Sequence, residues 1–167
     1  MHFLGAVIGA ENEEEVEDIL ADWSEYADVE EYIAQTREEI LSDGRAEDQD
    51  YLRHGKDMDA RKAAAERLAL NENGDAVSTF NKDSFYDYYE IGEWEGVEDM
   101  QKATCHELLE RYRRDVGNVR SIINSLSVIC RRDWRDGELW NGTTIETVLA
   151  ELEQGEDQKV WFVNFHD

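Results

Sequence analysis

Two apolar runs, one at each end of the chain, constrain the fold more than any other feature of the sequence. Residues 2–9 are HFLGAVIG and residues 160–165 are VWFVNF. Both runs are rich in branched and aromatic side chains, and runs this short are typical of interior strands. Strands from the two ends of a domain commonly pair within one sheet. We therefore expect one sheet to contain both ends of the chain.

Helical patterns follow the first run. Asn12 is placed to cap a helix that opens with three glutamates, where the helix dipole favours acids. The buried stripe of this helix would consist of Val16, Ile19, Leu20 and Trp23. Apolar spacing after Asp28 predicts a second helix that ends near Gly44, and the alanine-rich segment 59–70 predicts a third one after a polar loop.

The middle of the chain has the pattern of a hairpin. The runs 76–80 and 85–91 are rich in β-branched and aromatic residues, and they flank the turn formers of 81–84. Alternation in the second run places Tyr86, Tyr88 and Glu90 on one face of the strand.

The longest helical pattern extends from about residue 99 to 133, with apolar side chains repeated at threes and fours. It predicts one long helix, or two helices joined near Gly117. Cys105 and Cys130 would then lie about 37 Å apart, too far for a disulfide, and we expect both to be buried thiols. Thr143 or Thr144 would cap a last helix that ends at Gly155.

Together these elements predict an α+β fold. We expect a single domain over residues 1–167, with a small antiparallel sheet of three or four strands that includes both terminal strands. Several helices would pack on this sheet, among them the long one near 99–133.

Charge restricts the possible partners. The chain has 41 acidic and 17 basic side chains, a formal net charge of −24, and residues 1–50 contain 17 of the acids against 2 bases. Such a surface is repelled by nucleic acids and by anionic membranes, so we expect no direct binding to either. No apolar run approaches 18 residues, and a cytosolic protein is expected.

The acidic residues between Glu11 and Glu31 are the strongest functional signal. Runs of acids are often solvated helix faces, but carboxylates held on ordered helices also imitate the phosphate density of a duplex. Long-range attraction would steer such a surface into a cationic nucleic-acid channel. Aromatic residues of the hairpin region would add specific contacts to this charge. The candidate partner-binding residues are therefore Glu13, Glu14, Glu15, Glu17, Asp18, Asp22, Glu25, Asp28, Glu30, Glu31, Tyr86, Tyr88 and Trp94.

Other candidate sites are weaker. The seven arginines of 111–136 suit internal ion pairing with acidic helices better than phosphate binding. His2 and His166 would meet if the terminal strands are neighbours, but terminal histidines are more often surface groups than metal ligands. Cys105 and His106 are adjacent on a helix and do not face each other. We therefore predict no catalytic residue, no metal and no cofactor.

Three segments resemble a family of uncharacterised small bacteriophage proteins. They are NGDAVSTFN at 73–81, SFYDYYEIG at 84–92 followed by Trp94, and the two ends of the chain. Members of the family begin with Met-His-Phe and a strand, and they end on a short apolar strand that contains His. Where the family has Gly-Gly-Arg-Trp, this chain has Gly92-Glu93-Trp94, so the expected cation is missing. The resemblance implies a phage origin and supports the fold, and it implies no activity.

These observations predict a phage-encoded acidic inhibitor that acts in the host cytoplasm without catalysis. Its target would be a host protein with a cationic nucleic-acid-binding groove, and an anti-CRISPR or antirestriction protein is the most concrete version. The alternative is a phage accessory protein that binds a small ligand, or catalyses a reaction, near Tyr88, Trp94 and His166. A structural or assembly protein is the third class.

Overall fold

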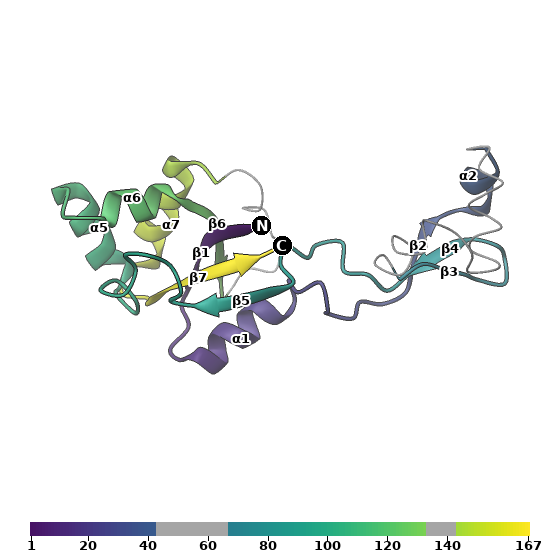
Figure 1. Cartoon of the computed structure of the whole chain (residues 1–167), viewed down its shortest axis with the longest axis horizontal. Coiled ribbons are helices and arrows are strands. Elements are labelled where there is room, and N and C mark those ends of the chain that lie inside the picture. The colour runs from purple at the N-terminus through teal and green to yellow at the C-terminus, as the bar shows by residue number, and fades with distance from the viewer. Residues whose placement is uncertain (43–66, 133–142) are drawn as a thin grey trace. The chain divides into compact units, whose positions relative to one another are not determined.

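The chain folds into two compact units in the computed structural model (Figure 1). One unit is formed by residues 1–25 and 83–167, and the other by residues 26–82. The residues that the structure describes are 1–42, 67–132 and 143–167. Helices combined with two small sheets confirm the predicted α+β class. The single domain expected over 1–167 stays a prediction, and each unit is described by itself.

A four-stranded sheet organises the first unit. Its strands are β1 (His2–Ile8), β5 (Tyr88–Ile91), β6 (Leu126–Arg131) and β7 (Val160–His166), in the order β5-β7-β1-β6. β1 and β7 are antiparallel over their whole lengths, from the pair His2 and His166 to the pair Ile8 and Val160, which confirms that the terminal strands are neighbours. β6 is parallel to β1, so this sheet is mixed and not wholly antiparallel.

Helix α1 (Glu13–Ala21) packs on one face of this sheet. The Asn12 side chain accepts a hydrogen bond from the Glu15 N–H at 3.0 Å, which is the predicted N-cap. Val16 and Leu20 are fully buried and contribute to a core cluster with Val163 and Phe165 of β7. The predicted stripe of this helix is therefore confirmed.

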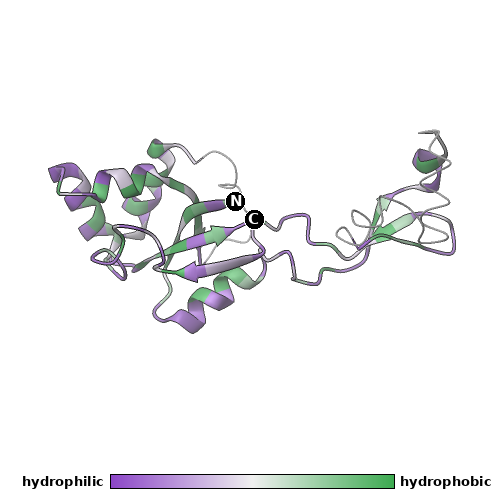
Figure 2. Ribbon diagram, viewed as in Figure 1, coloured by the Kyte–Doolittle hydropathy of each residue, from purple (hydrophilic) through white to green (hydrophobic). Residues whose placement is uncertain are grey.

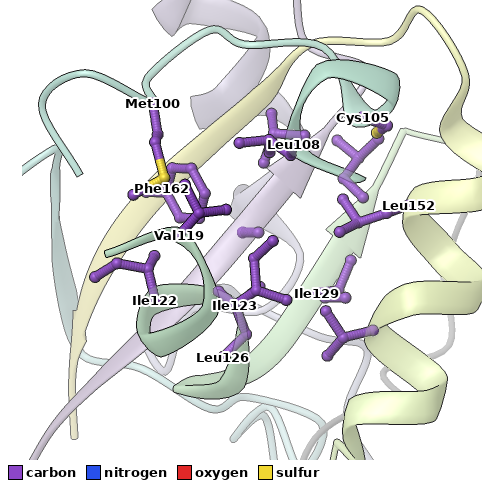
Figure 3. Close-up of a cluster of buried hydrophobic side chains, with 14 of the residues drawn as sticks. Met100, Cys105, Leu108, Val119, Ile122, Ile123, Leu126, Ile129, Leu152 and Phe162 are labelled. Atoms are coloured by element: carbon purple, nitrogen blue, oxygen red, sulfur yellow. The ribbon is translucent and has the colours of Figure 1, made fainter. Parts of the chain in front are cut away.

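Three helices cover the other face: α5 (Cys105–Arg114), α6 (Val119–Asn124) and α7 (Ile145–Gly155). Leu108, Ile123 and Leu152, one from each helix, meet Ile129 and Phe162 of the sheet in a second core cluster, the α5–α7 core cluster (Figure 3). The side chain of Thr144 caps α7, and Thr104 with Glu107 forms a capping box on α5. The last predicted helix is thus confirmed.

One continuous helix over 99–133 is not present, but the alternative of two helices joined near Gly117 is found in α5 and α6. This region contains α5, α6 and strand β6, and the left-handed conformations of Asp115 and Gly117 break the path between the helices. β6 escaped recognition because it is buried on both faces, with Val128 in the α1 cluster and Ile129 in the opposite cluster. A strand covered on both sides does not alternate. Cys105 and Cys130 fall in different clusters, and both are buried free thiols.

The second unit corrects two further predictions. Its sheet has the order β2-β4-β3, with β2 (Tyr32–Gln35), β3 (Ala69–Leu70) and β4 (Ala76–Ser78). The helix expected after Asp28 is a strand followed by the short helix α2 (Arg37–Ser42), because pairing with β4 overrides the local pattern. The expected hairpin is also wrong, since β4 and β5 belong to different sheets.

Some predictions fall on residues that the structure does not describe. The polar loop near 45–59, most of the helix expected over 59–70, and Arg135 lie outside the described residues. The described end of that helix, residues 69–70, is strand β3. In the part of the chain that is described, no helix is long and apolar enough to cross a membrane.

Candidate functional site

The acidic face of α1 is the first candidate site. Glu13, Glu14, Glu17 and Asp18 are all exposed, and no described lysine or arginine forms an ion pair with them. The buried side of the helix is apolar, so these carboxylates are held on its outer side by the packing of Val16 and Leu20 (Figure 2). We name these four residues the α1 acidic face.

The spacing of this face follows from the helix. Glu13 and Glu17, like Glu14 and Asp18, are four positions apart and form two neighbouring rows. Six acids lie between residues 13 and 22. At a rise of 1.5 Å per residue, this segment has about one negative charge per 2.5 Å of axis, against about one per 1.7 Å for duplex DNA. The charge density of α1 is therefore somewhat below that of a duplex and of the same order.

The other predicted acids of this unit are Glu15, Asp22 and Glu25, and the Glu15 carboxylate is bound within the unit. The Glu15 carboxylate accepts from the Glu11 N–H at 2.9 Å and pairs with Arg132 at 3.2 Å. Asp22 is exposed at the C-cap of α1, and the half-buried Glu25 donates its backbone N–H to the Tyr86 carbonyl at 2.9 Å. Glu15 therefore supports the end of the sheet more than it adds to the exposed charge.

Asp28, Glu30 and Glu31 belong to the second unit, so the acidic series is divided between two units. The Asp28 carboxylate accepts from the Arg67 guanidinium at 2.6 Å. Glu30 and Glu31 are exposed just before β2. In the sequence, residues 13–31 form one acidic run. In the structure, the two parts of this run belong to different compact units.

The predicted internal pairing is found for five of the seven arginines of 111–136. Arg113 and Arg114 both contact Glu110, Arg120 lies 3.6 Å from Asp115, and Arg132 reaches Glu15. Arg131 forms a buried ion pair with Glu151 at 3.1 Å. These described arginines therefore neutralise acids of their own unit.

The three candidate aromatic residues have different environments. Tyr86 is buried, and its hydroxyl donates to the Leu20 carbonyl at 2.7 Å, so it holds the end of α1. Trp94 is partly buried against the α5–α7 core cluster. Tyr88 is 50 % exposed and is the most accessible of the three. Burial, with a smaller contribution from the charge of Glu90, raises the pKa of Tyr88 above its usual value.

A polar cluster surrounds Tyr88 at the end of the sheet where the two termini meet (Figure 1). The Tyr88 ring stacks on the His166 ring, with centroids 3.7 Å apart and planes at 24°, and the His2 ring meets His166 edge-on at 3.7 Å. His166 Nε2 lies 3.4 Å from Glu90 Oε2 and 3.4 Å from Asn164 Nδ2. We name these five residues the β5-end cluster.

Two members of this cluster, Glu90 and Asn164, are absent from the predicted site. A signal for them exists in the sequence, since alternation places Glu90 beside Tyr88, and Asn164 is a polar residue inside an apolar strand. The meeting of His2 and His166 was predictable from the two terminal strands alone.

Metal ligands and activated thiols are the groups to look for at both candidate sites. No three described His, Cys, Asp or Glu residues are arranged to hold a metal ion. Burial raises the pKa of Cys105 to about 11 and that of Cys130 to about 12, so neither is an activated thiolate at neutral pH.

The chain matches no protein-family model, no curated protein and no solved structure.

Proposed function

We propose that the protein is a phage-encoded acidic inhibitor of a host nucleic-acid-binding defence machine, of the anti-CRISPR or antirestriction type. It would act by occupying a cationic groove with the α1 acidic face in place of a polynucleotide. The observation that carries the proposal is the contrast between this face and the rest of its unit. Four exposed carboxylates of α1 have no described ion-pair partner, while five arginines of the same unit form ion pairs within it, namely Arg113, Arg114, Arg120, Arg131 and Arg132.

Physical reasons favour this use of the charge. Packing of α1 on the sheet fixes the backbone that bears the carboxylates, so little backbone freedom is left to lose on binding. A net charge of −24 adds a long-range field that steers the protein toward cationic surfaces. The resemblance of residues 73–94 and of the chain ends to phage proteins supports the phage origin.

The test compares two variants of equal net charge. In the first, the α1 acidic face is neutralised by Glu13→Gln, Glu14→Gln, Glu17→Gln and Asp18→Asn. In the control, four exposed acids of the same unit are neutralised by Glu93→Gln, Glu95→Gln, Glu98→Gln and Asp99→Asn. Each immobilised protein is exposed to a bacterial lysate at low salt, and bound proteins are eluted with duplex DNA.

We expect the wild type and the control to retain DNA-binding proteins that duplex DNA displaces, and the α1 variant to lose them. The retained nuclease should then be inhibited by the wild type and not by the α1 variant. Equal retention by the two variants, or retention that duplex DNA leaves unchanged, would contradict mimicry by α1.

A further inference from the structure

The β5-end cluster lies on the opposite face of the sheet from α1. Alternation along β7 places Phe162, Asn164 and His166 on one face, and Phe162 packs in the α5–α7 core cluster. Tyr88 pairs with His166 and Glu90 pairs with Asn164 across the antiparallel strands, so all four share that face. The cluster is therefore distinct from the α1 acidic face. The sequence analysis groups Tyr88 with the acids of α1, but the structure places them on opposite faces of the sheet.

The Tyr88 ring is held in place and yet half exposed. Its stacking on His166, which His2 contacts from β1, fixes the orientation of the ring. Exposure of 50 % leaves aromatic surface for a ligand. An oriented aromatic ring with a carboxylate two residues along the strand attracts a flat cation, through the ring quadrupole and through charge.

A second, independent feature of the cluster is a buried hydrogen-bond acceptor that lacks a donor. Asn164 is 7 % exposed, and its Oδ1 atom is a buried acceptor without a donor in the described structure. Buried polar atoms are nearly always paired. Asn164 stands directly opposite Glu90 on the neighbouring strand, where side chains lie about 5 Å apart. A ligand that pairs with the exposed Glu90 carboxylate would therefore lie next to Asn164, and it would reach the buried Oδ1 atom once the side chains that cover this atom move aside.

One chemical group satisfies all three features. A guanidinium is flat, positively charged and carries five N–H donors in a fixed fork, so it can stack on Tyr88 while donating to Glu90 and Asn164. A lysine ammonium lacks the flat face, and an anion would be repelled by Glu90 and by the net charge. A metal ion would lack a third ligand among the described His, Cys, Asp and Glu residues.

We propose that the β5-end cluster is a second docking site, which binds one arginine side chain of the partner protein. The inference takes the identity of the partner as a cationic protein from the proposed function, but it assigns a different face and a different chemistry. The α1 acidic face would supply attraction that is indifferent to the kind of cation, and the β5-end cluster would select arginine over lysine.

The experiment measures the affinity of the full chain for two peptides of equal charge, nona-arginine and nona-lysine, at physiological salt. We expect the wild type to bind nona-arginine about tenfold more tightly than nona-lysine, the size of one stacked and paired guanidinium. The preference should disappear in Tyr88→Leu and in Glu90→Gln. It should remain in Tyr88→Phe, which keeps the ring, and in Glu98→Gln, which matches the change in charge.

Nuclear magnetic resonance of the same samples adds a readout that is independent of affinity. Nona-arginine should shift the Asn164 side-chain amide resonances of the wild type and leave them unmoved in Glu90→Gln. Equal affinity of the wild type for the two peptides, or a preference that survives Tyr88→Leu, would overturn the inference.

The variant that neutralises the α1 acidic face separates this inference from the proposed function. It should lose affinity for both peptides by the same factor and keep the arginine preference. Loss of the preference in this variant would also overturn a separate arginine site. Failure of the lysate experiment above would count against mimicry by α1 and would leave the peptide result standing.

Discussion

The two helical layers of the first unit use their charges in opposite ways. Helix α1 covers one face of the four-stranded sheet, has three glutamates in its first turn and has no base in its last turn. Helix α5, on the other face, has one acid in its first turn and three arginines in its last turn. The charges of α5 suit the helix dipole at both ends, whereas those of α1 suit it only at the first.

The contacts of the two layers deepen the contrast. Arg113 and Arg114 of α5 pair with Glu110 and Glu153, and behind them the Arg131–Glu151 pair is buried between β6 and α7. The outer carboxylates of α1 have no such partners among the described residues. Several charges of the α5–α7 layer therefore stabilise the fold through ion pairs, whereas the outer carboxylates of α1 form no ion pair among the described residues.

The largest expected effect comes from removing the buried ion pair of the α5–α7 layer. Glu151→Ala removes one partner of the buried pair, leaving the Arg131 guanidinium buried at 8 % exposure without its carboxylate. We expect a loss of about 3–5 kcal/mol in the free energy of unfolding, measured by urea denaturation.

The control for this variant is Glu153→Ala. It removes the exposed Arg113–Glu153 pair from the same helix, and it should cost less than about 1 kcal/mol. Equal losses in the two variants would show that burial of the Arg131–Glu151 pair does not increase the cost of breaking it.

A second, smaller effect on stability is expected in both layers, because each contains one buried cysteine. Cys105 belongs to the α5–α7 cluster and Cys130 to the α1 cluster, and burial raises the pKa of the first to about 11 and of the second to about 12. A raised pKa in the folded state stabilises the protein fully below the unfolded pKa, about 9. The stabilisation is lost as the pH rises from there through 11 and 12.

Each thiol should therefore lower the free energy of unfolding by about 1 kcal/mol per pH unit above pH 9. The difference between the wild type and Cys130→Ala, measured by urea denaturation at several pH values, isolates one thiol. A difference that stays constant from pH 8 to pH 11 would contradict the assigned burial.

The smallest expected effect tests whether the two helices are anchored equally. Asn12 caps α1 and Thr104 caps α5, each through one side-chain oxygen that accepts a backbone N–H. Asn12→Ala and Thr104→Ala should each reduce the free energy of unfolding by about 1 kcal/mol in urea denaturation. A loss well above this in only one variant would mean that one helix depends on its cap far more than its packing indicates.

What the sequence predicted well was local. The caps Asn12 and Thr144 and the apolar runs of β1 and β7 carry their signals within a few residues, and each was located correctly. The errors concern segments whose structure depends on distant partners. β2 takes strand form by pairing with β4, and the turn formers of 81–84 lie where the chain passes from one unit to the other.

The candidate sites show the same division. The exposed acids of α1 follow from helical periodicity, so Glu13, Glu14, Glu17 and Asp18 could be placed from the sequence. The burial of Tyr86 could not, because it depends on contact with the end of α1, 66 residues earlier in the chain. The pairing of Glu90 with Asn164 required the order of the strands, which no local pattern supplies.

The most direct test of the central claim is the salt dependence of binding to the retained host protein. Affinities of the wild type, the α1 variant and the charge-matched variant of residues 93–99 are measured from low to high ionic strength. If the α1 acidic face takes the place of phosphates, the wild type and the matched variant should lose affinity steeply with salt, and the α1 variant should bind weakly with a clearly shallower salt dependence. Identical salt slopes for the two neutralised variants would contradict the account, because the position of the charge would then not matter.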